Sequence, residues 1–245
     1  MSRLTRGVRV SLLLRSLSIQ GSWNYQTLIG TGFAFVLLPA LRRVYQEDEE
    51  ALRAAAARHA ELFNSHPYLV TVAVGAVARL EDEGTPPEMI RRFKSALRGS
   101  LGTIGDRLVW QAWRPACALL GIALLLAGVP WWASLAAFLV AYNALHLWLR
   151  AWGLRTGLQE GLAVGRALRE APFQRLGDRA SDAGAFLAGL SCVLAIGYAF
   201  REAGEYGLGA LAVAAGLWLG LRIRIAVWAV LVVVWAVDII VVATS

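Results

Sequence analysis

Apolar and polar stretches alternate in the first half of the chain, and apolar runs dominate the second half. Residues 26–41 and 68–80 are apolar, but both runs are shorter than the about 20 helical residues that cross a bilayer. Runs of this length are typical of re-entrant or interfacial segments. Residues 115–128 and 131–149 are joined by Gly128-Val129-Pro130 and predict a helical hairpin in the membrane. Further apolar runs follow at 183–200, 207–221 and 225–243.

The polar segments between the early runs predict amphipathic helices. Residues 1–25 predict a short basic helix, and Pro39 predicts a break near the end of the apolar run that follows. A polar helix is expected over residues 46–65, because acidic residues at its start and basic residues near its end complement the helix dipole. Pro67 is expected to end it.

A second polar helix is predicted to begin at a proline-rich turn. Thr85 is the expected N-cap, Pro86 the first helical residue and Glu88 the capping-box partner. Three glycines spaced three residues apart predict the end of this helix; they are Gly99, Gly102 and Gly105. Residues 150–182 are again polar and arginine-rich, and we expect a cytoplasmic connector there.

The composition identifies the class of protein. Hydrophobic residues make up 58% of the 245 residues and the mean hydropathy is +0.55, whereas soluble domains are about 45–50% apolar. The sequence therefore predicts an all-α, multi-pass membrane protein with re-entrant or interfacial segments and cytoplasmic amphipathic helices. We expect interfacial helices in residues 1–110, a membrane hairpin in 111–149, a connector in 150–182 and C-terminal membrane helices in 183–245.

The net charge of +7 comes from arginines that flank the apolar runs. This pattern indicates the positive-inside bias of membrane loops rather than nucleic-acid binding. It places residues 1–25, 42–66, 81–100 and 150–182 in the cytoplasm, with the N-terminus inside and the C-terminus outside. Asp238 lies inside the last run and is expected to face protein or water.

No catalytic set is recognisable in the sequence. Cys117 and Cys192 lie in apolar runs and read as small buried hydrophobes. The three histidines lack the spacing of metal ligands, and no nucleotide-binding loop is present. We therefore expect a protein that is not an enzyme and that needs neither a metal nor another cofactor.

Three polar-aromatic motifs supply the candidate site residues: GSWNY, FNSHPYL and GTIGD. Trp23, Asn24 and Tyr25 fit an interfacial anchor, or a contact with a sugar or a partner. Asn64 and His66 fit a turn in which the imidazole caps backbone groups; the alternative is a phosphate acceptor.

Asp106 and Arg107 belong to the third motif and carry opposite charges beside an apolar run. They fit either a structural ion pair or the lining of a polar pathway. We expect Asp106 to accept hydrogen bonds from the re-entrant segments, for example from Asn24 or Asn64.

The motifs, in this order, resemble those of the IID subunit of mannose-family phosphotransferase-system permeases. The similarity rests on SIQGSWNYQTLIGTGFAFVLLPALRRVY, HAELFNSHPYL, RFKSALRGSLGTIGDRLVWQAWRP and WGLRTGLQEG, and covers roughly residues 12–165. The chain departs from the family pattern at Gln26, where glutamate is common, and at Arg107, where a small residue or proline is common. The family's longer segment before the last helices is largely missing.

The resemblance implies an inner-membrane subunit that pairs with a IIC subunit, in contact with membrane lipid and in a higher oligomer of such pairs. It further implies that the pair translocates a hexose or amino sugar, while soluble IIA and IIB partners carry the phosphate on their own histidines. The alternative function is that of a degenerate IID homologue that regulates or signals through the phosphorelay without moving sugar.

Overall fold

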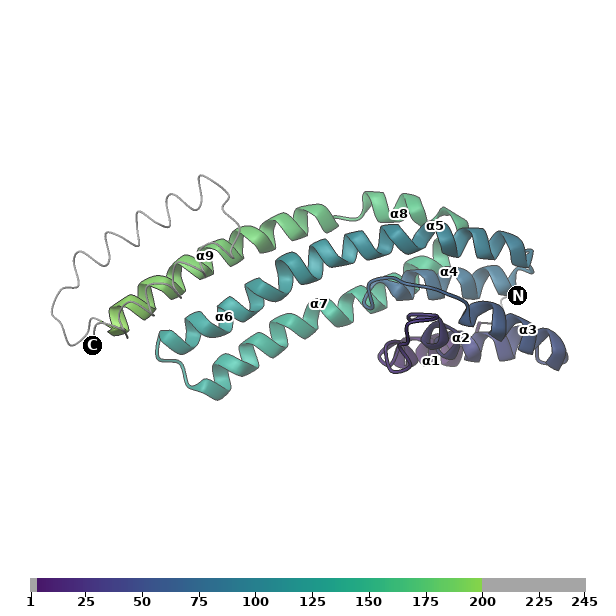
Figure 1. Ribbon diagram of the computed structural model, residues 1–245, viewed down its shortest axis with the longest axis horizontal. Helices are drawn as coiled ribbons and strands as arrows, with labels where there is room; N and C mark the ends of the chain where they lie inside the picture. Colours follow the sequence, from purple (N-terminus) through teal and green to yellow (C-terminus); the bar gives the residue numbers. More distant parts are fainter. Residues whose placement is uncertain (1–3, 200–245) are drawn as a thin grey trace. The chain divides into compact units, whose positions relative to one another are not determined.

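The computed structural model describes residues 4–199, and all named secondary-structure elements in that range are helices (Figure 1). The elements are, in order, α1 (Arg6–Ser16), α2 (Gly30–Val44), α3 (Glu49–Ala60), α4 (Val70–Asp82), α5 (Pro87–Gly105), the π-helix η1 (Asp106–Trp113), α6 (Arg114–Leu126), α7 (Trp131–Glu160), the 3₁₀ turn η2 (Gly161–Ala163), α8 (Val164–Glu170) and α9 (Phe173–Ala199). The predicted all-α class is confirmed. The runs at 207–221 and 225–243, Asp238 and the predicted position of the C-terminus lie outside the described residues.

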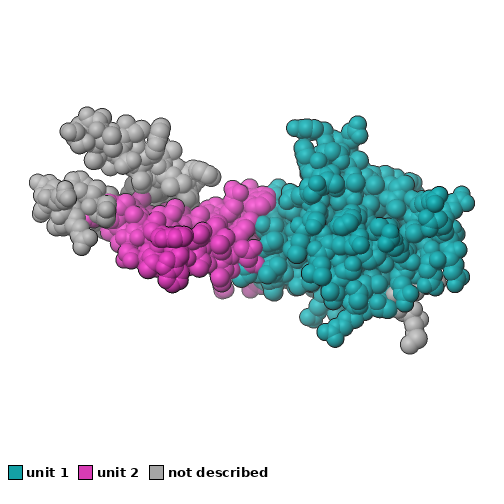
Figure 2. Space-filling view, turned by 90° about the horizontal axis from the view of Figure 1, so that it is seen from below, with its two compact units in different colours: residues 1–106, 144–172 teal, residues 107–143, 173–245 magenta. Residues whose placement is uncertain are grey.

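The chain forms two compact units, coloured separately in Figure 2. Unit 1 consists of residues 1–106 and 144–172, and unit 2 of residues 107–143 and 173–245. Helix α7 contributes its second half to unit 1 and its first half to unit 2. All three polar-aromatic motifs therefore fall in unit 1, and Arg107, directly after the last of them, is the first residue of unit 2.

The core of unit 1 is built around α4, which is enclosed by protein. Every residue from Val70 to Ala78 is buried, and α2 packs against α1, α3 and α4. A Cβ placed on Gly157 would lie 2.3 Å from the Val72 carbonyl oxygen, and one on Gly75 would lie 2.5 Å from the Leu154 oxygen. Only glycine allows α4 and the second half of α7 to approach this closely. Apolar run 68–80 thus forms a core helix of its unit.

The predicted break at Pro39 is wrong, because α2 continues from Gly30 through Val44. Proline removes the N–H that would bond to the carbonyl oxygen four residues earlier, which belongs to Phe35. That oxygen instead accepts a hydrogen bond from the Arg15 guanidinium at 3.1 Å, and the same guanidinium lies 4.7 Å from the centre of the Phe35 ring. Arg15 of α1 therefore supplies the donor that the proline lacks.

The polar helix predicted over 46–65 is shorter than expected and ends at Ala60. The acidic start of this helix is confirmed: Glu49 and Glu50 lie in its first turn, and the Asp48 carboxylate accepts the backbone N–H of Ala51 at 2.8 Å. After Ala60 the backbone turns to pair with the loop before α2: the Phe63 N–H donates to Thr27 and the Ile29 N–H donates to Phe63. These long-range bonds replace the helical ones and end α3 before the proline is reached.

The predicted start of the next helix also needs correction. Pro87, not Pro86, is the first residue of α5, and Thr85 is not its N-cap. Pro86 precedes a proline and is therefore held in an extended conformation. Its α-helical part does end at Gly105, the last glycine of the predicted series, but the backbone stays helical and continues through the π-helix η1 into α6.

In unit 2, α6 and the first half of α7 are joined by a turn in which Gly128 has a φ of +88°, at the place expected for the hairpin. Helix α7 then runs on to Glu160, past the expected end of the second arm at residue 149. Within this unit α6 packs against α9. Many of its large apolar side chains are exposed, among them Leu125, Trp131, Trp132, Val140 and Phe186. Two helical stretches, within Pro87–Leu126 and Trp131–Ala195, are long and apolar enough to cross a membrane. The exposed apolar side chains are therefore placed where lipid or a membrane partner would cover them.

Candidate functional site

The three motifs come together at one place in unit 1, which we call the motif junction (residues 21–29, 61–69 and 102–106). The backbones of Leu28 and Phe63 form a β-bridge that joins the first two segments. Gly105 closes the third side: a Cβ there would lie 2.2 Å from Cβ and Cγ of His66. Segments that are about 40 residues apart in sequence therefore share one packed junction, in which only a glycine fits behind the imidazole.

The GSWNY loop is held by its asparagine. The Oδ1 atom of Asn24 accepts the backbone N–H groups of Gln26 and Thr27 at 2.9 Å each, and its Nδ2 donates to Ser22 and to Thr27. Both ends of the amide are thus engaged within the loop. Trp23 and Tyr25, in contrast, are 46% and 89% exposed and lie edge to face, 4.8 Å between ring centres. The loop therefore displays its aromatic side chains and uses its asparagine internally.

His66 occupies the turn that the sequence predicts. Its Nδ1 accepts the Tyr68 N–H at 3.2 Å, and its carbonyl accepts the N–H groups of Leu69 and Val70 at the start of α4. The direction of the first bond puts the ring proton on Nε2. The side chain is 1% exposed, and burial, helped by the charge of Arg150, lowers its pKa to about 4. His66 is consequently a neutral, buried capping group at neutral pH.

The second half of α7 adds a polar group behind this turn. His146 stacks on Tyr68 at 4.0 Å between ring centres, and its Nε2 accepts a hydrogen bond from Arg150 at 2.7 Å. The guanidinium of Arg150 is 3% exposed and also donates to the Ser16 carbonyl at the end of α1. Arg150 thus links α1, α7 and the turn before α4.

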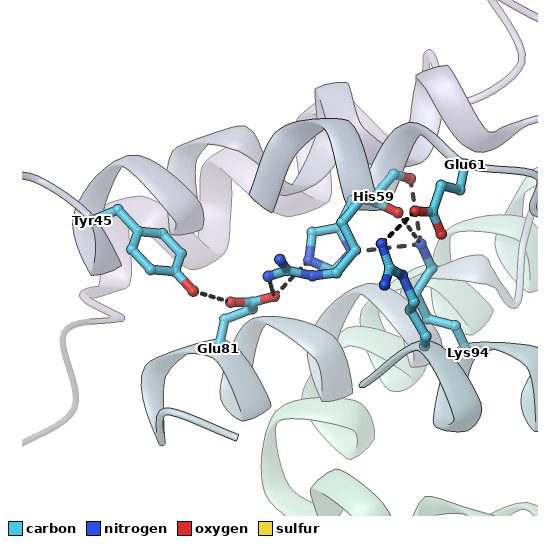
Figure 3. A network of polar contacts seen from close by, with 7 residues as sticks. Tyr45, His59, Glu61, Glu81 and Lys94 are labelled. Carbon is cyan, nitrogen blue, oxygen red and sulfur yellow. Dashed lines mark hydrogen bonds and ion pairs between the residues drawn. The ribbon is translucent and has the colours of Figure 1, made fainter. Parts of the chain in front are cut away.

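A second buried polar group is the Glu81 cluster (Tyr45, Arg58, His59, Glu81 and Lys94), which joins α3, α4 and α5 to the residue that follows α2 (Figure 3). The Glu81 carboxylate accepts hydrogen bonds from Tyr45 at 2.5 Å, from Arg58 at 2.7 Å and from His59 Nε2 at 2.7 Å. On the other side of the imidazole, the Lys94 ammonium lies 3.5 Å from His59 Nδ1. An ordered series of Glu81, His59 and Lys94 therefore runs from α4 through α3 to α5.

The electrostatics of this cluster follow from burial and pairing. Burial raises the pKa of Glu81, but the bonds from His59, Tyr45 and Arg58 outweigh that effect and hold the pKa at about 2. Burial lowers the pKa of His59 to about 4, against the opposing effect of Glu81. Burial and the Glu81 hydrogen bond both raise the pKa of Tyr45. At neutral pH the carboxylate is ionised and the imidazole is neutral, so the carboxylate compensates Arg58.

The other predicted site residues lie on the surface of their units. Asn64 and Asp106 are exposed, and the Asp106 carboxylate makes no hydrogen bond or ion pair within residues 4–199. The expected bond from Asn24 or Asn64 to Asp106 is therefore wrong, because Asn24 satisfies its amide inside its own loop. Arg107 does not pair with Asp106; its guanidinium lies 3.5 Å from Asp178 of α9.

Sequence reasoning missed the Glu81 cluster and the pair of His146 and Arg150. A signal was present in each case. Glu81 ends an apolar run, Lys94 is the single lysine of the chain, and Arg150 follows a membrane-type run at the i+4 position from a histidine. Ionisable residues beside such runs usually have buried partners. Within the described part of the chain, no cluster of metal-ligating side chains is found.

Comparison with known proteins identifies the family. The family model of the PTS system mannose/fructose/sorbose family IID component matches residues 3–199. This chain belongs to that family. The match extends on both sides of the region, roughly 12–165, over which the motifs show the resemblance.

Relatives of this IID component include sugar-specific proteins from different bacteria. The mannose-specific EIID component of Escherichia coli (strain K12) is 31% identical over 192 residues, which cover 76% of this chain and 67% of that protein. The fructose permease IID component of Bacillus subtilis (strain 168) is 32% identical over 195 residues, covering 76% and 69%. The family relationship is thus shared with proteins named for different sugars.

The fold of this IID component is similar to chains in two solved membrane-protein structures. A cryo-electron microscopy structure of the mannose transporter ManYZ in complex with microcin E492 contains a chain that is 25% identical, with a TM-score of 0.63. The match covers 100% of this chain and 98% of that one. A structure described as a membrane protein matches with a TM-score of 0.71 and 25% identity, covering 98% and 97%. The membrane character predicted from hydropathy is confirmed by these likenesses.

Proposed function

We propose that this IID component pairs with a IIC membrane subunit in the bacterial inner membrane. Together they form the path by which a hexose or amino sugar crosses, and soluble IIA and IIB proteins phosphorylate the sugar as it enters. The observation that carries the proposal is the family match over residues 3–199. The relatives named for mannose, fructose and sorbose support a sugar as the substrate.

The state of the three histidines supports a role without phosphoryl transfer on this chain. A histidine that carries phosphate needs a ring nitrogen that a donor protein can reach. His59 and His66 are only 0% and 1% exposed. His59 Nε2 contacts Glu81, and His146 Nε2 accepts from Arg150. These imidazoles stabilise helix contacts, so we assign the phosphate-carrying histidines to the soluble partners.

The exposed side chains of the motifs are the proposed contacts with other molecules. Trp23 and Tyr25 offer an aromatic surface of the kind that is enriched at protein interfaces. We assign these two residues to contact with the IIC subunit. Asn64 and Asp106 are exposed polar groups, and we assign them to the mouth of the translocation path. We assign structural roles to the remaining three candidates. Arg107 pairs with Asp178, and Asn24 and His66 hydrogen-bond within their own loops.

The test is uptake of radiolabelled mannose, fructose and glucosamine by cells with an intact gene, a deleted gene and a restored gene. We expect deletion to abolish uptake and phosphorylation of at least one sugar, with recovery on restoration. Unchanged uptake, together with altered phosphorylation of the soluble carriers, would favour the regulatory alternative. Unchanged uptake and unchanged carriers would contradict both.

A further inference from the structure

A pocket of about 330 Å³ opens between the end of α3 and the first half of α5, within unit 1. Its wall on the α3 side is formed by Glu61, Leu62 and Phe63. Its wall on the α5 side is formed by residues that recur at helical spacing, namely Glu88, Arg91, Arg92, Lys94, Ser95 and Arg98. Residues 91, 94, 95 and 98 share one face of a helix, so three cations and a hydroxyl point toward the same space.

The buried member of this set, Lys94, feels the charges of Glu61 and Glu81 but has neither carboxylate in direct contact. It is 6% exposed, and its ammonium lies 3.4 and 3.5 Å from the carbonyl oxygens of His59 and Arg58. It also lies 4.9 Å from the centre of the Phe33 ring. Within the described residues no carboxylate oxygen comes within 4.0 Å of it. Buried cations are normally paired with an anion, so a nearby ligand of negative charge would complete this site.

The rim of the pocket leaves further positive charge unused. Arg91 pairs with Glu61 at 2.8 Å, and Arg92 pairs with Glu88 at 3.6 Å. Arg98 is exposed and forms no ion pair or side-chain hydrogen bond within residues 4–199. The lining carries four cations and two carboxylates, a formal surplus of two positive charges. Lys94 and Arg98 are the two lining cations without a direct ion pair among the described residues, and they lie one helical turn apart.

We propose that this pocket binds a phosphate-bearing anion, with Lys94 at its floor and Arg98 and Ser95 at its mouth. Arginine offers a planar fork that matches phosphate oxygens, lysine a compact charge and serine a hydroxyl donor. The pocket volume leaves room for the group to which the phosphate is esterified. The ligand is therefore a phosphate monoester in solution or the headgroup of an anionic phospholipid, and the site does not depend on the sugar path proposed above.

The experiment uses the full chain purified from membranes in detergent with its co-purifying subunits. Its melting temperature is followed by tryptophan fluorescence while inorganic phosphate replaces chloride at constant ionic strength. Phosphate also stabilises proteins without binding, by exclusion from their surface. Binding at the pocket is therefore recognised by an increase in melting temperature whose dependence on phosphate concentration changes with Arg98. Arg98→Gln should raise the half-saturating phosphate concentration about tenfold, equivalent to about 1.4 kcal/mol, and Arg98→Lys should restore most of it. The control Arg53→Gln removes an exposed, paired arginine of α3 and should change nothing.

A second arm separates the two sources of the phosphate group. Nanodiscs of phosphatidylglycerol and of phosphatidylcholine are compared without added phosphate. If a lipid headgroup is the ligand, wild type and Arg53→Gln melt higher in phosphatidylglycerol, and Arg98→Gln loses that difference. If a soluble phosphate ester is the ligand, only inorganic phosphate gives the Arg98-dependent rise. Absence of an Arg98-dependent effect in both arms overturns the proposal.

Discussion

Replacement of Glu81 by glutamine tests whether the buried cluster stabilises unit 1 as its geometry indicates. The substitution keeps the size and planarity of the side chain and removes its charge, which leaves Arg58, 8% exposed, without its carboxylate. Removing one partner of a buried ion pair costs about 3–5 kcal/mol. For a chain of this length, 3 kcal/mol lowers the melting temperature by about 6–12 °C.

A matched control lies two residues away on the same helix end. Glu83 pairs with Arg79 at 2.6 Å, but its side chain is 48% exposed, so Glu83→Gln should change stability by only about 0.5 kcal/mol. The assay is the melting temperature of both variants and of wild type, each purified with its co-purifying subunits at pH 7. Equal shifts in the two variants would refute the view that Glu81 compensates the buried Arg58 cation.

Three other predictions follow from particular contacts. Gly105→Ala should lower the melting temperature by several degrees, because its Cβ would overlap a buried imidazole, whereas Gly102→Ala, with open space around it, should raise stability by about 0.5–1 kcal/mol; the reverse order would contradict the packing of the motif junction. Stability should fall as pH drops from 6.5 toward 4, because His59 has a pKa of about 4 in the folded protein and therefore takes up a proton mainly in the unfolded chain over this interval. A melting temperature that rises as pH drops would contradict the assignment of His59 as a neutral, buried imidazole. Replacing Trp23 and Tyr25 together by alanine should reduce co-purification of the IIC subunit at unchanged melting temperature, since both rings are exposed; unchanged recovery would remove them from the interface.

The sequence predicts the helical class, the hairpin and the turn at His66 because each depends on neighbouring residues. Hydropathy over short windows identifies apolar helices. The turn at Gly128-Val129-Pro130 and the capping by His66 are local as well. These features need no knowledge of how distant segments meet, and the structure confirms them.

The errors share one physical origin, which is compensation from a distant part of the chain. Pro39 does not break α2, because Arg15 supplies a donor to the Phe35 carbonyl. Helix α3 ends early, because Phe63 pairs with the loop that contains Thr27. Neither partner can be recognised from local composition.

The buried clusters could not be assembled from the sequence for the same reason. Tyr45 follows α2, while His59, Glu81 and Lys94 come from three other helices, and the separations have no regular period. Each residue by itself fits an exposed position on an amphipathic helix. Only the packing of α3, α4 and α5 reveals that they share one buried site.

Reconstitution into proteoliposomes tests the central claim most directly, which is that this IID component and a IIC subunit together move sugar. Vesicles are prepared with both subunits, with each one alone and with neither. Phosphorylated IIA and IIB are placed on the side that corresponds to the cytoplasm, and radiolabelled sugar is added on the opposite side. We predict that sugar phosphate accumulates on the cytoplasmic side only when both subunits are present. Equal accumulation with IIC alone would contradict the account.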